Sequence, residues 1–262
     1  ILKKCGYPLF HLSNDTEFAG TKDLLTALGV DSVLGGDFNG KYKDQAWGGA
    51  YDMDIFTEAK EIIKQAPENP FMIFIATTQT HAPDGFLDQR VLPHIQSQAT
   101  NYENAVLSTD WLIGDFIHFL ENENRLDNTV IYLFPDHFFY GMKDVFYKTE
   151  IKKPLWFMTN AEEKNLSIDT ANFYQVDIPG LILSGAEIKH DVVFFSDTIN
   201  ENKDDFIKKN IKEIAALNTF SIERDSIIGR NIAFSLSKEH LICMLNNENL
   251  FIKKKTNKKK CF

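Results

Sequence analysis

Long hydrophobic runs are absent from this 262-residue sequence. A membrane-spanning helix needs about 20 consecutive apolar residues, and the opening residues contain no small-residue cleavage site of an export signal. We therefore expect this stretch of chain neither to cross a membrane nor to carry its own export signal. A first residue of Ile in place of Met suggests a fragment or a trimmed chain.

Closely spaced cysteines are missing as well. Cys5, Cys243 and Cys261 lie far apart and form no CxxC pair, so the sequence indicates neither a zinc ribbon nor a disulfide framework. Low-complexity segments are absent too, and 44% of the residues are hydrophobic. This composition predicts a folded domain with a substantial core.

A basic surface is lacking over most of the chain. The formal net charge is −9 although the last ten residues contain six lysines, which leaves about −15 on the remainder. Binding to a phosphate backbone requires a basic surface, so nucleic acid is not expected as a partner. The lysine tail is interpreted as a solvated terminus, with contact to anionic lipid as the alternative.

What the sequence does contain is organised around residues 128–140. Residues 130–134 are a continuous apolar run of strand length, which is typical of a buried strand in a parallel sheet. Pro135 ends the pairing and leaves Asp136 and His137 at the carboxyl end of the strand, where open α/β sheets bind ligands. An adjacent carboxylate and imidazole can bind one metal ion. The alternative is that both are ordinary loop residues.

The other elements alternate between strands and helices, which predicts an α/β fold with a three-layer, mostly parallel sheet and helices on both faces. Residues 102–120 repeat apolar side chains at intervals of three and four and, together with the strand at 130–134, predict a right-handed βαβ unit. A small antiparallel meander is expected at the carboxyl terminus. The further strands are expected at 7–12, 31–34, 71–77, 154–158, 231–234, 241–245 and 250–253, and the further helices at 21–28, 54–65, 176–183 and 201–217.

Two sequence motifs, taken together, are more specific than a generic α/β pattern. Residues 71–83 form a strand that runs into a Thr-His-Ala-Pro turn, and residues 126–137 form a strand that ends in Asp-His, with a Tyr-headed helix between them. This order resembles the sulfatase and alkaline-phosphatase-like superfamily, especially the branch of lipoteichoic acid synthases and phosphoglycerol transferases. Weaker similarity at 154–157 and 176–179 extends the resemblance over roughly residues 7–183.

The resemblance implies roles for several residues. Asp136 and His137 are implied as ligands of a divalent metal ion, commonly manganese in this branch and zinc or calcium in others. His81 stands where the family has a substrate-facing histidine, which could bond to a phosphoryl oxygen or protonate the leaving alkoxide. A loop histidine satisfied by local backbone is the alternative for His81.

Substrate contacts are implied for His11, Phe18 and Trp47. In the family the histidine matching His11 is followed after seven positions by a tryptophan and after nine by an arginine. Phe18 keeps the aromatic ring, but Gly20 stands in place of the cation that would grip an anionic oxygen. His11 as a plain strand-end residue is the alternative. Trp47-Gly48, with Asp52 and Asp54 after it, loosely resembles a Trp-Gly-x-x-Asp phrase of the same branch, with the spacing off by one, and Asp54 is interpreted as a helix cap.

The family's nucleophile and its early acidic metal ligand would both precede Ile1. We therefore expect residues 1–200 to be a partial sulfatase-like catalytic domain without the N-terminal part of the family fold, and residues 201–262 to add a helix, an antiparallel extension and the basic tail. The implied protein is a metal-dependent phosphoglycerol or phosphoethanolamine transferase-like enzyme at the extracytoplasmic face of a membrane. It would act on phospholipid-derived or other anionic esters, together with its upstream segment. A sulfatase or phosphatase, or an inactive remnant, are the alternatives.

Overall fold

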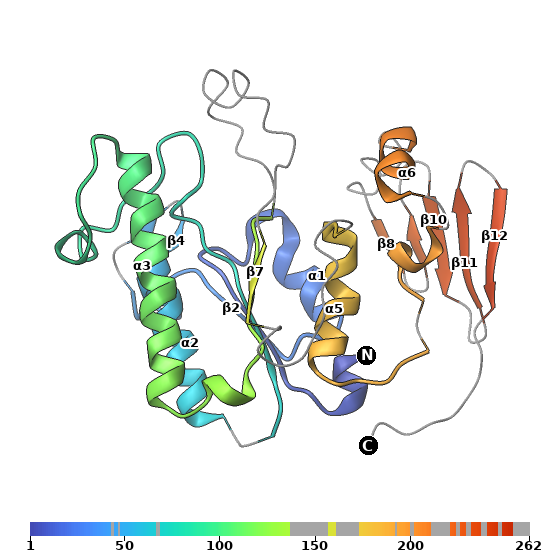
Figure 1. Ribbon diagram of the computed structural model, residues 1–262, viewed down its shortest axis with the longest axis horizontal. Coiled ribbons are helices and arrows are strands. Elements are labelled where there is room, and N and C mark those ends of the chain that lie inside the picture. Colours follow the sequence, from blue (N-terminus) through green and yellow to red (C-terminus); the bar gives the residue numbers. More distant parts are fainter. Residues whose placement is uncertain are drawn as a thin grey trace. The chain divides into compact units, whose positions relative to one another are not determined.

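The computed structural model describes residues 1–42, 45–46, 48–66, 69–136, 157–160, 173–191, 193–199 and 202–210, and five strands between residues 221 and 253 (Figure 1). The chain forms two compact units, Ile1–Lys164 and Asn165–Phe262. No helix of the described residues is both long enough and apolar enough to cross a membrane. Cys5 is disulfide-bonded, which the wide spacing of the cysteines did not indicate.

A three-stranded parallel sheet lies at the centre of the first unit. Strand β1 (Leu9–Leu12) pairs on one side with β2 (Ser32–Leu34) and on the other with β5 (Met72–Ile75), parallel to both. These strands confirm the ones expected at 7–12, 31–34 and 71–77, with shorter bounds. Because all three run in the same direction, their carboxyl ends meet at one edge of the sheet, which we call the carboxyl edge.

Helices cover both faces of this sheet, as the sequence predicted. Figure 1 shows α2 (Asp52–Gln65) and α3 (Asn101–Asn122) on one side of the strands and α1 (Thr21–Ala27) on the other. The core lies on the side of α2 and α3. One cluster of buried side chains joins β1 to α2, and a second joins α2 to α3; their members are Leu12, Ile55 and Ala59, and Phe56, Val91 and Leu112.

Helix α3 begins at a capping box that the apolar repeat alone did not locate. The Thr100 hydroxyl accepts from the backbone N–H of Glu103 at 3.1 Å, and the Glu103 carboxylate accepts from the backbone N–H of Thr100 at 3.1 Å. Farther along the helix, Trp111 stacks on His94, with ring centroids 4.3 Å apart. The helix is therefore fixed at its first turn and packed against the segment that precedes it.

The strand expected at residues 130–134 is shorter than predicted. Strand β6 covers only Tyr132–Leu133, and its partner among the described strands is β7 (Met158–Thr159), which is antiparallel. Asn160 accepts from the Ile131 N–H at 2.9 Å and donates to the Thr129 carbonyl at 3.0 Å, so these backbone groups bond to a side chain in place of a neighbouring strand. The expected parallel βαβ unit is therefore wrong for the part of the chain that the structure describes.

Short elements complete the first unit. Strands β3 (Gln45–Ala46) and β4 (Gly49–Ala50) form a small antiparallel pair. Short 3-10 helices lie at Leu2–Cys5, Phe18–Gly20, Leu92–His94 and Leu126–Asn128.

The second unit holds helices and an antiparallel sheet. Helix α5 (Ile178–Gly185) has Pro179 in its first turn, as expected, and α6 (Lys203–Lys209) is the described part of the helix expected at 201–217. The expected C-terminal meander is confirmed, and two strands precede it. The five strands run antiparallel in the order β12-β11-β10-β9-β8: β8 (Ser221–Glu223), β9 (Ser226–Ile228), β10 (Ile232–Leu236), β11 (His240–Leu245) and β12 (Glu248–Lys253), with 3-10 helices at Gln175–Asp177 and Phe195–Thr198 before them.

Candidate active site

Backbone hydrogen bonds join the loops at the carboxyl edge of the sheet. The N–H of Gly36, after β2, donates to the carbonyl of Asn14, after β1, at 2.7 Å. The N–H of Ala50 in turn donates to the Gly36 carbonyl at 2.8 Å, and the N–H of Ala76 donates to Leu12 at 2.8 Å. Four segments that are distant in the sequence are thus held together where open α/β sheets bind ligands.

Two glycines allow these loops to approach each other. A Cβ atom on Gly49 would lie 1.5 Å from the carbonyl oxygen of Asn14, and a Cβ atom on Gly35 would lie 2.5 Å from the carbonyl oxygen of Ser13. Neither position has room for a side chain. The loop after β1 is consequently packed backbone against backbone, which fixes its path at the edge.

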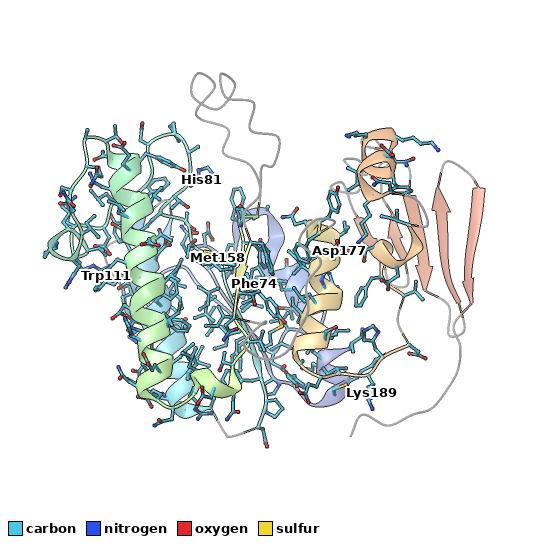
Figure 2. All side chains as sticks on the ribbon, in the orientation of Figure 1. Phe74, His81, Trp111, Met158, Asp177 and Lys189 are labelled. Carbon is cyan, nitrogen blue, oxygen red and sulfur yellow. The ribbon has the colours of Figure 1, made fainter. Side chains whose placement is uncertain are left out.

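His11 lies on β1, one residue before the carboxyl edge. Its ring stacks on Phe74 of β5, with centroids 5.4 Å apart and planes 14° from parallel. His11 is 7% exposed, whereas Phe74, marked in Figure 2, is 43% exposed. Burial lowers the pKa of His11 below its ordinary value. The ring is therefore favoured in its neutral form, and its Nε2 atom has no hydrogen-bond partner within the described residues.

His81 lies in the loop that follows β5. This loop covers residues 76–91, and we call it the His81 loop. Its Nδ1 atom is 2.7 Å from the carbonyl oxygen of Ala82. A carbonyl oxygen can only accept a hydrogen bond, so Nδ1 carries a proton. In the neutral ring Nε2 is then the atom that can accept a proton, and Figure 2 shows the position of His81 on the loop. His11 thus lies on β1, and His81 lies in the loop that follows the neighbouring strand β5.

Asp52, in the first turn of α2, is indicated by the sequence only as a helix-start residue within the loose Trp-Gly-x-x-Asp-like phrase, without a role in the site. Its side chain is fully buried, and its two oxygens accept from the backbone N–H groups of Thr78, at 2.8 Å, and Gln79, at 3.1 Å. Burial raises the pKa of Asp52 to about 6, against the effect of these two hydrogen bonds. The carboxylate thus fixes the start of the His81 loop.

Asp54 is not the helix cap that the sequence suggested. The residue that precedes α2 is Tyr51, with no side-chain cap bond, and the Asp54 carboxylate instead accepts from both terminal nitrogens of Arg90 at 2.8 Å. Arg90 also donates to Asp88, from Nε at 3.0 Å and from Nη2 at 2.7 Å. The partner lies 36 residues away, so local sequence reasoning could not find it.

The model of the sulfatase family matches residues 1–209 of this sequence. The chain belongs to the sulfatase family. This match confirms the resemblance inferred from the Thr-His-Ala-Pro and Asp-His phrases, and members of the wider superfamily generally use divalent metal ions.

Solved structures show the same fold. The lipoteichoic acid synthase LtaP from Listeria monocytogenes is 16% identical, with a TM-score of 0.57 over 98% of this chain. A protein in the alkaline phosphatase superfamily from Vibrio parahaemolyticus is 15% identical, with a TM-score of 0.51 over 97% of the chain. The alignments span 66% and 59% of those two proteins. A search of curated proteins finds no match.

The other residues to which the resemblance assigned roles are Phe18, Trp47, Asp136 and His137, and the structure describes only two of them. Phe18 is 62% exposed and lies in the 3-10 helix that follows the loop after β1. Asp136 is exposed and follows β6 by three residues. Trp47 and His137 lie outside the described residues, so the predicted Asp136–His137 pair stays a prediction.

The donor chemistry of that pair suits a divalent metal ion of the kind that the sulfatase family uses. A carboxylate oxygen and an imidazole nitrogen are ligands that manganese and zinc accept. Among the described residues there is no group of three or more His, Cys, Asp or Glu side chains that could hold an ion. Asp136 is thus the described residue from which a metal site at this strand end would be built.

Proposed function

We propose that this chain is the carboxyl-terminal part of a metal-dependent phosphoglycerol or phosphoethanolamine transferase-like enzyme that acts on phosphodiesters. The observation that carries the proposal is His11, a buried neutral imidazole at the carboxyl edge whose Nε2 has no partner among the described residues. A buried polar atom without a partner costs about 1–3 kcal/mol. A phosphoryl oxygen bound at this edge would accept a hydrogen bond from Nε2–H and remove that cost.

The other residues have roles consistent with this one. His81 holds its proton on Nδ1, so Nε2 can exchange a proton with the oxygen of the departing alcohol. Phe18 and Trp47 would contact the substrate, and Asp136 and His137 would hold a divalent ion, manganese in the first instance and zinc or calcium otherwise. When bound, such an ion neutralises charge on a phosphoryl oxygen. No residue of this chain matches the family's nucleophile, which the proposal assigns to the rest of the enzyme.

Two further properties belong to the proposal. The substrate is a phospholipid-derived or other anionic ester, and the enzyme works at the extracytoplasmic face of a membrane. The acidic body of the chain, with a net charge of −9, agrees with a substrate other than nucleic acid.

Hydrolysis of a sulfate or phosphate ester is the second candidate, because the family model that matches is that of the sulfatases. Both candidates use the same edge and differ in what accepts the transferred group. Gly20, where the transferase branch has a cation, weakens the grip on an anionic oxygen and leaves both candidates open to test.

The test compares two chromogenic substrates, bis-p-nitrophenyl phosphate and p-nitrocatechol sulfate, with the whole enzyme of which this chain is proposed to be a part and with added Mn²⁺. Turnover of the phosphodiester that disappears in His137→Ala and falls in His11→Gln supports the proposal. Turnover of the sulfate alone supports the second candidate. His118→Ala is the matched control, because His118 is exposed on α3 and pairs with Glu121. Metal binding without turnover points to an inactive remnant, and a chain that binds no Mn²⁺ overturns the proposal.

A further inference from the structure

The first turn of α2 carries two carboxylates that hold opposite ends of the His81 loop. Asp52 accepts from the N–H groups of Thr78 and Gln79 at the start of the loop. Asp54 binds both terminal nitrogens of Arg90 near its end. Polar side chains at the start of a helix often bond to backbone N–H groups of that same helix end. Here both reach into the same distant loop.

The two residues that Asp52 anchors take part in the backbone hydrogen bonds of the turn around His81. The backbone N–H of His81 donates to the carbonyl of Thr78 at 2.9 Å, and the N–H of Gly85 donates to the carbonyl of His81 at 3.0 Å. The N–H of Phe86 closes the turn on the carbonyl of Gln79 at 2.7 Å. The two residues that Asp52 holds are therefore the same two on which the turn around His81 is built.

Close packing against α3 limits other positions for this turn. Gly85 has a φ of +71°, and a Cβ atom there would lie 2.8 Å from the Cβ of Ala105 and 2.9 Å from the carbonyl oxygen of Gln79. The Gln79 side chain is fully buried. The turn is thus held from the α3 side by contact and from the α2 side by a carboxylate.

We propose that Asp52 is a positioning residue for His81: by accepting from two successive backbone amides it sets the turn that places the imidazole at the carboxyl edge. A carboxylate suits this task because charge-assisted hydrogen bonds to backbone amides are about twice as strong as neutral ones. The inference rests on the proposed function for what His81 does, and on the geometry alone for what holds it there.

The test uses the 262-residue chain with ¹³C,¹⁵N-labelled histidine, in which His81→Gln assigns the His81 ring signals. Asp52→Asn keeps the shape of the side chain and removes one of the two acceptors. It should shift the His81 ring resonances and raise the rates of amide hydrogen exchange at Thr78 and Gln79. We expect an increase of about tenfold or more, because one hydrogen bond to a charged group is lost. Asp31→Asn is the control, since Asp31 accepts from the Leu9 N–H at 3.0 Å at the other end of β1. It should leave the His81 signals unchanged.

Unchanged His81 resonances in Asp52→Asn, together with faster exchange at Thr78 and Gln79, would overturn the proposal. None of these measurements requires turnover, so a failure of the proposed function is seen separately. In a chain that does turn over substrate, kcat should fall about 10- to 100-fold with little change in KM.

A second measurement decides the matter if Asp52→Asn does not fold. In the His81→Gln protein, the amide chemical shifts of Thr78 and Gln79 report the charge on Asp52. The amide chemical shift of Gly85 reports whether the change in charge also affects the turn beyond position 81. Asp88 is a charged group that acts on Asp52 from the loop, and Asp88→Asn removes that charge. A common midpoint near pH 6 at all three amides is expected. A Gly85 amide that does not follow the other two contradicts the proposal.

Discussion

Asp54 and Arg90 face each other through two parallel hydrogen bonds, Nη1 to Oδ1 and Nη2 to Oδ2, each 2.8 Å long. The carboxylate is almost completely buried, and Asp88, also buried, accepts from the same guanidinium. A guanidinium shared by two buried carboxylates is difficult to replace, because its fork matches their geometry. The arrangement ties the end of the His81 loop to the start of α2.

Arg90→Met should lower the free energy of unfolding by about 2–3 kcal/mol, since it leaves two buried carboxylates without their shared partner. Urea denaturation at neutral pH measures the change. Lys22→Met, which removes the exposed ion pair with Glu17, should leave the free energy of unfolding nearly unchanged. Equal effects of the two substitutions would contradict a structural role for the Arg90 cluster.

Asp52→Asn should change how stability depends on pH. Burial raises the pKa of Asp52 from 3.8 to about 6, so the folded protein binds this proton more tightly than the unfolded chain does. Protonation of Asp52 therefore contributes up to about 3 kcal/mol to the free energy of unfolding of the wild type. This contribution is fully present below about pH 4 and is lost as the pH rises through 6. Urea midpoints of the wild type and the variant at pH 4 and pH 7 measure the difference. A difference that is independent of pH would rule out this titration.

His11→Phe should act in the opposite direction. Burial lowers the pKa of His11 from 6.5, so the unfolded chain binds this proton more tightly, and wild-type stability declines as the pH falls below 6.5. Phe can stack on Phe74 and does not titrate. We expect the variant to lose less stability than the wild type between pH 7 and pH 5, as followed by thermal unfolding. A larger loss in the variant would show that His11 is not buried as a neutral ring.

Gly49→Ala should disrupt the carboxyl edge, because the new Cβ would lie 1.5 Å from the Asn14 carbonyl oxygen. We expect a loss of about 2–4 kcal/mol in stability and shifted His11 ring resonances. Gly114→Ala is the matched control, since it lies within α3 with no atom within 4 Å of the added Cβ. That substitution should stabilise the protein by about 0.5–1 kcal/mol. A tolerated Gly49→Ala would mean that the two loops are not in contact.

The sequence predicted those elements whose pattern is local. The apolar run at 71–77 and the repeat through Tyr102 and Leu112 are visible in single windows of sequence, and the structure confirms β5 and α3. The phrase around His81 led to the right family because it combines a strand, a turn and a following helix. The expected α/β fold follows from the same features.

Contacts between distant residues could not be predicted in this way. The bonds from Asp52 to Thr78, and from Asp54 to Arg90, span 26 and 36 residues. The shortness of β6 depends on Asn160, which bonds to the backbone of Thr129 and Ile131. Each depends on the fold bringing separate segments together, which no pattern within one segment records.

The stack of His94 on Trp111, with centroids 4.3 Å apart, lies just beyond the His81 loop. Light emission from an indole depends on what lies against it, so separating the two rings changes the fluorescence of Trp111. Since the chain has three tryptophans, replacing Trp47 and Trp156 by Phe leaves Trp111 alone to emit. The fluorescence of Trp111 therefore reports whether the segment that carries His94 stays packed on α3 or moves away from it when a ligand binds.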